Sequence, residues 1–171
     1  MMDPSLEDQI EDLKALVERS AVVAGFTGAG ISTESGVPDF RSPGSPWLKN
    51  QPIPFDAYVR SREARREAWR RKFAMDDLYR GARPSRGHLA LASLVASGRM
   101  PAVITQNIDG LQQEAGTPAD KVIELHGNGT YATCLDCGER HELDWVRSRF
   151  EATGERPPTD PAAVPEDEAD A

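Results

Sequence analysis

The sequence predicts an α/β fold built on a Rossmann-like parallel sheet, and two observations support this class. Short apolar runs rich in β-branched residues occur at 21–26, 101–105 and 121–125, as expected for buried strands. Glycine or polar residues follow each run, and helical segments lie between the runs. In open α/β sheets, ligands bind beyond the carboxyl ends of the strands. We therefore expect a ligand site at that edge of the sheet.

Length and charge limit the classes of protein that fit this chain. Its 171 residues allow one domain with a sizeable core. The net charge is −8, but residues 151–171 hold seven acidic residues and one arginine, so the rest of the chain is nearly balanced. Nothing in this balance indicates a nucleic-acid-binding surface. The acidic start and the lack of a long apolar run argue against a signal peptide and a membrane span, so we expect a cytoplasmic protein without direct nucleic-acid or membrane partners.

The N-terminal segment is predicted to be an amphipathic helix over 6–19. Ser5 followed by Asp8 resembles a capping box, and apolar residues recur at helical spacing from Leu6 to Val17. A helix and then a strand that lead into a glycine turn are typical of open α/β sheets.

The glycine turn Gly28-Ala29-Gly30 follows the first predicted strand and is the first candidate site. Small residues there let the backbone approach a ligand closely. Ser32 and Ser35 are expected to cap a following helix, whose free N–H groups and positive dipole end would form a phosphate cradle. The two glycines are a weak signal by themselves, because Thr33 stands at the third glycine position of the dinucleotide fingerprint. A purely structural turn remains the alternative.

The tetrapeptide Pro38-Asp39-Phe40-Arg41 adds a carboxylate, an aromatic ring and a guanidinium close to this turn. Residues 42–56 are rich in proline and are predicted to be a loop, either a lid or a surface connection, that Trp47 and Phe55 could anchor. A basic helix is predicted over 61–75. Its basic side chains form either a solvated face or a wall that steers cofactor phosphates or an acidic partner.

Polar side chains follow the second and third predicted strands. Gln106, Asn107 and Asp109 come after the second strand, and His126 comes after the third. Asn and Asp also form turns for local reasons, and a lone histidine is more often structural. Because the strand ends bring these groups to one edge of the sheet, we interpret them as parts of one site. His88, at the start of the helix predicted before the second strand, is interpreted as a capping or packing residue.

The motif Cys134-Leu135-Asp136-Cys137, followed by Gly138, predicts a zinc-binding turn in which two thiolates bind one metal ion. The sequence holds only these two cysteines, so a second Cys pair is lacking. His141 is either a third ligand or an ordinary exposed histidine, and we favour the latter. A redox pair is less favoured, because such motifs begin a helix that follows a strand.

Together, these motifs resemble the signature of the sirtuins, the NAD-dependent protein deacylases. Three blocks match in order and the first Cys pair of the zinc ribbon follows, so that the resemblance covers about residues 6–150. The blocks are Gly28-Ala29-Gly30-Ile31-Ser32 through Pro38-Asp39-Phe40-Arg41, then Thr105-Gln106-Asn107-Ile108-Asp109-Gly110-Leu111, then Leu125-His126-Gly127-Asn128. The resemblance implies a Rossmann-like NAD-binding domain over 1–130 and a partial zinc-binding module over 131–150. The composition of 151–171 predicts a disordered acidic tail.

The resemblance also implies the reaction and the role of each site residue. NAD and an acyl-lysine protein or peptide would react to give nicotinamide, free lysine and O-acyl-ADP-ribose. His126 would act as general base on a ribose hydroxyl, Asn107 and Asp109 would line the nicotinamide pocket, and Phe40 would cover the ribose face and exclude water. The implied catalytic residues are His126 and Asn107, the implied zinc ligands are Cys134 and Cys137, and the implied NAD-binding residues are Gly28, Ala29, Gly30, Ser32, Asp39, Phe40, Arg41, Gln106, Asn107, Asp109 and His126.

The chain departs from the family pattern after residue 150. The second Cys pair, the strand that pairs with the acyl peptide and the later Rossmann strands are missing, and Gln112-Gln113 stands where members commonly have a histidine. The chain therefore resembles a C-terminally truncated member with an incomplete sheet. Two alternatives follow: an inactive NAD-binding fragment, or a protein mono-ADP-ribosyltransferase.

Overall fold

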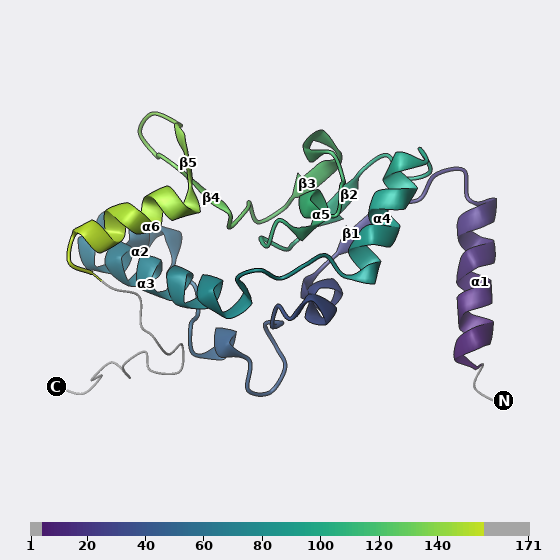
Figure 1. Cartoon of the computed structure of the whole chain (residues 1–171), viewed down its shortest axis with the longest axis horizontal. Coiled ribbons are helices and arrows are strands. Elements are labelled where there is room, and N and C mark those ends of the chain that lie inside the picture. Colours follow the sequence, from purple (N-terminus) through teal and green to yellow (C-terminus); the bar gives the residue numbers. More distant parts are fainter. Residues whose placement is uncertain (1–4, 156–171) are drawn as a thin grey trace.

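The computed structural model describes residues 5–155, which form a three-stranded sheet, a two-stranded hairpin and several helices (Figure 1). In chain order the elements are α1 (Leu6–Arg19), β1 (Gly25–Thr27), η1 (Ala29–Ser35), η2 (Pro46–Leu48), α2 (Phe55–Arg60), α3 (Arg62–Tyr79), α4 (Arg86–Ala96), β2 (Val103–Thr105), α5 (Leu111–Glu114), η3 (Ala119–Lys121), β3 (Val122–Glu124), β4 (Tyr131–Thr133), β5 (Arg140–Glu142) and α6 (Leu143–Ala152). The η elements are 3₁₀ helices. None of the helices in 5–155 is long and apolar enough to cross a membrane.

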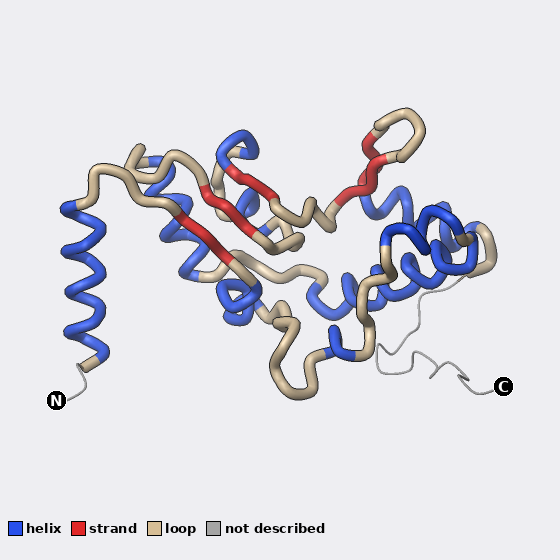
Figure 2. The backbone as a smooth tube through the Cα atoms, turned by 180° about the vertical axis from the view of Figure 1, so that it is seen from behind, coloured by secondary structure: helices blue, strands red, loops and turns tan. Residues whose placement is uncertain are grey.

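The sheet is parallel, with the strands in the order β1-β2-β3, which confirms the predicted α/β class (Figure 2). Gly25 pairs with Val103, and Val103 pairs with Val122. Because all three strands run in the same direction, the glycine turn, the segment after β2 and the segment after β3 leave the sheet at one edge. The fold thus brings the polar strand ends together, as predicted.

The strands are shorter than the sequence indicates, and Pro101 provides the physical reason. The strand predicted at 21–26 pairs only from Gly25, and Val22 is 66% exposed rather than buried. In the observed register Pro101 would lie opposite Val23, but proline has no N–H group to continue the ladder. The N–H of Val23 instead donates to the carbonyl of Arg99, in the turn that precedes β2, at 3.0 Å.

Helix α1 has the predicted limits and the predicted cap. The N–H of Asp8 donates to the Ser5 hydroxyl at 3.2 Å, and the Ser5 N–H donates back to the Asp8 carboxylate at 3.1 Å. The helix nevertheless lies at one end of the molecule and buries none of its residues (Figure 1). Phe26, Ile123 and Leu125 of the sheet region are also largely exposed. The described part of the chain therefore leaves much apolar surface uncovered.

The opposite end of the molecule is a helical unit made of α2, α3, α6 and the β4–β5 hairpin (Figure 1). Its core consists of Phe73, Leu143 and Phe150. Arg147 of α6 lies over the Phe73 ring and forms ion pairs with the acidic residues near the end of α3. Helix α3 extends to Tyr79, beyond its predicted limit of 75, because the additional turn carries the two acidic residues that pair with Arg147 of α6.

The tail expected from residue 151 begins inside this helical unit. Helix α6 continues to Ala152, and the Glu155 carboxylate forms ion pairs with Arg66 and Arg70 of α3. Local composition did not show this, because the partners lie in α3, far away in the sequence. The remainder of the expected tail, 156–171, lies outside the described residues.

Candidate active site

The glycine turn between β1 and η1 leaves an open backbone surface. Gly28 has φ −135°, and neither Gly28 nor Gly30 adopts the left-handed conformation that requires glycine. A Cβ atom on either residue would meet no atom within 4 Å. The turn therefore needs glycine neither for its conformation nor for internal packing, and the missing side chains leave room for a ligand. This open surface favours a turn that faces a ligand over a purely structural turn.

A cavity of about 530 Å³ lies beside this turn, between η1 and α4. Gly87 of α4 permits the close approach of the two helices, because a Cβ there would lie 2.9 Å from Cγ1 of Ile31. The segment after the turn is a 3₁₀ helix rather than the expected helix capped by Ser32 and Ser35. Its N-cap is Gly28, without a side-chain cap, so both serines were assigned the wrong local role.

Ser32 is the centre of a buried hydrogen-bond cluster and is fully inaccessible to solvent. Its Oγ donates to Oδ2 of Asp109 at 2.7 Å and accepts from Nδ2 of Asn107 at 3.0 Å. Asn107 Nδ2 also donates to the carbonyl of Gly28 at 3.1 Å, which fixes the orientation of its amide because a carbonyl can only accept. The Oδ1 atom of Asn107 has no hydrogen-bond partner within 5–155 and is left for a ligand.

Asp109 is held from two sides. Its Oδ2 accepts from Ser32, and its Oδ1 accepts from the N–H of Leu111 at 3.0 Å, at the start of α5. The cluster therefore links the glycine turn after β1 to the segment after β2. The structure brings Ser32, Asn107 and Asp109 together, as their positions at the strand ends predict.

His88 lies directly behind Ser32 and is fully buried. It forms the predicted cap: its Nδ1 accepts from the N–H of Ser85 at 3.1 Å, and its own N–H donates to the Ser85 hydroxyl. The neutral ring therefore carries its proton on Nε2, which lies 3.5 Å from Oγ of Ser32. Burial lowers the pKa of His88, while the nearby Asp109 raises it. The cap motif in the sequence does not reveal the contact between His88 and Ser32, which are 56 residues apart.

A second buried polar group below the turn was not predicted. The hydroxyls of Thr27 and Thr105 bond across β1 and β2 at 2.9 Å, and Nε2 of Gln112 donates to Thr27 at 3.3 Å. Gln112 occupies the position that we noted as a departure from the family pattern, and it is almost completely buried. Side chains alternate between the two faces of a strand, so Thr27 and Thr105 point to the same face of the sheet. This alternation is the sequence signal from which their contact could be predicted.

His126 follows β3 and lies at the same edge of the sheet, exposed to solvent. Its Nδ1 lies 3.0 Å from the carbonyl oxygen of Gln106. Because a carbonyl cannot donate, the neutral ring keeps its proton on Nδ1, and Nε2 has the free lone pair. Nε2 of this exposed ring is thus available to accept a proton. The side chain of Gln106 is exposed, while its backbone holds this ring in place.

The segment 38–47 folds over the Ser32 cluster. Phe40 stacks on Trp47 with 4.5 Å between ring centroids, and Nε1 of Trp47 donates to the carbonyl of Pro38 at 3.0 Å. Trp47 therefore anchors the loop, as suggested, whereas Phe55 is exposed at the start of α2 and does not. The cavity between these rings and Asn107 is only about 20 Å³, which is space for roughly one water molecule. Any ring-sized ligand here requires this loop to shift.

Asp39 and Arg41 have different roles in this loop. The Asp39 carboxylate accepts hydrogen bonds from the hydroxyl of Ser42 and from the N–H groups of Ser42 and Arg41, which lowers its pKa. Asp39 is thus occupied in shaping the turn. The Arg41 side chain is exposed and has no ion-pair partner among residues 5–155, so that it is free to meet an anion.

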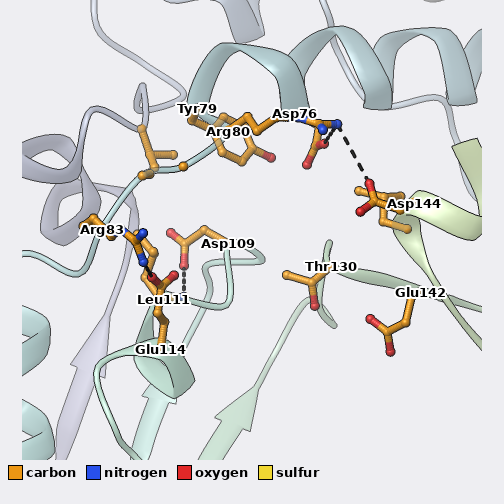
Figure 3. A pocket seen from close by; sticks show the side chains of 14 residues that line it. Asp76, Tyr79, Arg80, Arg83, Asp109, Leu111, Glu114, Thr130, Glu142 and Asp144 are labelled. Atoms are coloured by element: carbon orange, nitrogen blue, oxygen red, sulfur yellow. Dashed lines mark hydrogen bonds and ion pairs between the residues drawn. The ribbon is translucent and has the colours of Figure 1, made fainter.

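A third cavity, of about 370 Å³, opens between the end of α3, α5 and the hairpin (Figure 3). Asp109 and Tyr79 line both this cavity and the small one under Phe40, so the two are neighbours. Burial raises the pKa of Tyr79, and Asp76 and Asp109 raise it further. Arg83 is paired with Glu114 at 2.9 Å. The charged lining residues are Asp76, Arg80, Arg83, Asp109, Glu114, Glu142 and Asp144, so acidic groups predominate.

The predicted zinc ligands lie in the turn between β4 and β5. Backbone N–H groups of Cys137 and Asp136, together with the Cys137 thiol, hydrogen-bond to the Cys134 sulfur and lower the pKa of this thiol. Within 5–155, no three His, Cys, Asp or Glu side chains converge to hold a metal ion. Two thiols are half of the tetrahedral set that structural zinc requires. The described residues 5–155 therefore supply half of the ligand set of a closed zinc site.

The sequence matches known proteins over most of its length. The profile of the Sir2 family matches residues 28–160. The chain is 57% identical over 157 residues to the NAD-dependent protein deacetylase of Rhodopseudomonas palustris, covering 92% of this chain and 62% of that protein. It is 56% identical over 149 residues to NAD-dependent protein deacetylase 1 of Bradyrhizobium diazoefficiens, covering 87% of this chain and 59% of that protein. The chain thus spans about three fifths of the length of these relatives.

Solved structures show the same likeness. A Sir2 structure with a p53 peptide and NAD⁺ superposes with a TM-score of 0.69 at 36% identity, covering 84% of this chain and 56% of that chain. A Sir2 protein bound to a propionylated peptide superposes with a TM-score of 0.67 at 35% identity, covering 84% and 56%.

Proposed function

This chain belongs to the Sir2 family, and from this premise we propose that it forms the nicotinamide and phosphate side of an NAD-dependent protein-lysine deacylase. One observation carries the proposal. The Ser32–Asn107–Asp109 cluster and the free Nε2 of His126 lie at one edge of the parallel sheet, next to an open glycine turn. An amide acceptor, an anchored carboxylate and an imidazole base are the groups that the reaction needs there.

Bound NAD supplies a ribose carbon from which nicotinamide can leave. The open backbone at Gly28 and Gly30 admits the phosphates, and the exposed guanidinium of Arg41 balances their charge. Asn107 Oδ1 is free to accept from the carboxamide of nicotinamide, because Nδ2 is held by Ser32 and Gly28.

His126 is the proposed proton acceptor. Its Nδ1–H is held by the Gln106 carbonyl, so Nε2 can take a proton from a ribose hydroxyl. Phe40, carried on the loop that Trp47 anchors, covers the site and excludes water when the loop closes. In this assignment Asp109 and Ser32 are positioning residues, since they hold Asn107 and the turn in place.

The proposed substrates are an acyl-lysine protein or peptide and NAD, by analogy with relatives named NAD-dependent protein deacetylases and with Sir2 structures that contain peptides. The products would be nicotinamide, the free lysine and O-acyl-ADP-ribose, which makes the enzyme a transferase. Zinc is a further part of the proposal, with Cys134 and Cys137 supplying two of its four ligands. A cytoplasmic location is also part of the proposal, supported by the lack of a disulfide between these two cysteines.

The test measures nicotinamide release from NAD with an acetyl-lysine peptide, alongside NAD binding by calorimetry. We expect His126→Ala to lose turnover at least about a hundredfold while it retains NAD binding. His141→Ala is the matched control, because this ring lies on the hairpin and stacks on Trp145. Equal turnover in all three proteins would refute the role of His126. NAD binding without turnover in the unsubstituted chain would support the inactive NAD-binding fragment. ADP-ribosylated peptide detected by mass would support the alternative of a protein mono-ADP-ribosyltransferase.

A further inference from the structure

Gln112 reaches from α5 to the sheet beneath the glycine turn, and its side chain is almost completely buried. Its Nε2 donates to the Thr27 hydroxyl at 3.3 Å. The Thr27 hydroxyl in turn donates to the Thr105 hydroxyl, 2.9 Å away across β1 and β2. A side chain of α5 thus begins a chain of hydrogen bonds that crosses from one strand to the next.

This chain of hydrogen bonds ends at the backbone of Asn107. The Thr105 hydroxyl accepts from the N–H of Asn107 at 3.0 Å as well as from Thr27. The side chain of Asn107 carries the free Oδ1 that we propose as the acceptor for the carboxamide of nicotinamide. Gln112 therefore acts on Asn107 through two buried hydroxyls.

Helix α5 also holds the second polar residue of the proposed nicotinamide site. Oδ1 of Asp109 accepts from the N–H of Leu111, the first residue of this helix, at 3.0 Å. The position of α5 therefore affects Asp109 directly and Asn107 through Gln112. A contact between this helix and β1 fixes both residues relative to the glycine turn.

The buried amide of Gln112 is poorly explained by packing. Its Oε1 is buried and has no hydrogen-bond partner among residues 5–155. A buried polar atom without a partner lowers stability, and an apolar side chain of the same length would avoid this cost. The hydrogen bond that the amide donates to Thr27 is therefore the better explanation of a polar residue at this position.

We propose that Gln112 is a positioning residue for the nicotinamide site. Through the hydroxyls of Thr27 and Thr105 it holds the backbone of Asn107 where Oδ1 can meet the carboxamide. This inference rests on the proposed function and adds to it a residue that lies beneath the site. Loss of the Gln112 donor should therefore weaken the binding of ligands that contain nicotinamide and spare those that lack it.

The first experiment compares the 171-residue chain with Gln112→Met, which keeps a long side chain but has no amide. Calorimetry gives the affinities for NAD and for ADP-ribose, which lacks nicotinamide. We expect Gln112→Met to weaken NAD binding at least about fivefold, as for the loss of one hydrogen bond, and ADP-ribose binding less than about twofold. Gln113→Met is the matched control, because Gln113 is the next residue of α5 and donates to Glu124 at 2.6 Å. It should change both affinities less than about twofold.

The second experiment follows amide hydrogen exchange by NMR in the chain without ligand. The N–H of Gln106 donates to the carbonyl of Thr27 at 3.0 Å and serves as the internal reference. In Gln112→Met the N–H of Asn107 should exchange at least about fivefold faster, while that of Gln106 changes less than about twofold. Thr27→Val should have the same effect, and the double variant should add little to it, because both substitutions break one chain of hydrogen bonds.

The two readouts separate positioning from a general effect on the fold. Equal losses of affinity for NAD and ADP-ribose, or faster exchange at both amides, would show that Gln112 only stabilises the fold and would overturn the proposal. Unchanged NAD affinity in Gln112→Met would also overturn it. Absence of NAD binding in the unsubstituted chain would refute the proposed function, and the exchange rate of Asn107 would then decide whether Gln112 holds this residue.

Discussion

Replacing Ser32 with alanine tests whether the buried cluster holds the candidate site together. The substitution removes one hydroxyl, which donates to Asp109 at 2.7 Å and accepts from Asn107 at 3.0 Å. Ser32 is fully buried, so that water cannot take the place of the hydroxyl without opening the turn. The variant therefore leaves both partners short of one hydrogen bond.

The expected cost follows from the two bonds. A hydrogen bond to a carboxylate contributes about 1.5–3 kcal/mol, and one between neutral groups contributes about 1 kcal/mol. Asp109 is only partly buried and recovers some hydration, so we expect a net loss of about 2–3 kcal/mol in the free energy of unfolding. Affinity for NAD should fall as well, because Asn107 loses one of the two acceptors that orient its amide.

The assay is urea denaturation followed by circular dichroism, with NAD affinity from calorimetry. Thr33→Val is the matched control: it also removes one hydroxyl from η1, but this hydroxyl is exposed and bonds only the Gly30 carbonyl, at 2.9 Å. We expect the control to lose less than about 0.5 kcal/mol. If the two variants differed by less than about 0.5 kcal/mol, the reasoning that Ser32 is central to the site would be refuted.

Three further substitutions test other parts of the structure. Burial holds the pKa of His88 below its ordinary value of 6.5, so the free energy of unfolding should fall as the pH drops below that value. His88→Gln should make this decrease shallower between about pH 7 and about pH 5, and an unchanged pH dependence in urea titrations would contradict the prediction. Arg147→Met removes the ion pairs of a side chain that is only 13% exposed and should lower the free energy of unfolding, measured in urea, by about 2 kcal/mol. Arg149→Met, the control, should lower it by less than about 0.5 kcal/mol, and equal losses would exclude a stabilising role for these ion pairs. Gly28→Val should change the free energy of unfolding by less than about 1 kcal/mol, because a side chain at this position meets no other atom, but should weaken NAD binding at least about tenfold in calorimetry. Unchanged NAD affinity would show that the ligand does not contact the open turn.

Elements defined by neighbouring residues could be predicted from the sequence. The limits of α1 follow from the Ser5–Asp8 capping box and the apolar spacing, and the role of His88 as a cap follows from its position three residues after Ser85. The polar strand ends were also correctly assigned to one edge, because strands in a parallel sheet end on the same side. These features depend on contacts within a few residues or on a general rule of topology.

Strand length and the tail boundary required the tertiary structure. The first strand begins at Gly25 because Pro101, in another segment, cannot continue the ladder. Helix α6 continues into the segment whose composition predicted disorder, and Glu155 is bound by arginines of α3.

Ser32 shows most clearly what the sequence alone determined and what only the tertiary structure decided. The sequence determined that a small hydroxyl residue follows a glycine turn, and this pattern predicted a helix cap. Its actual partners lie 75 and 77 residues further along the chain, at Asn107 and Asp109. The proton position on His126 likewise depends on the Gln106 carbonyl, 20 residues away. Residue types and local spacing determine which groups are present, whereas burial and the pairing of distant strands decide which of them share a hydrogen bond.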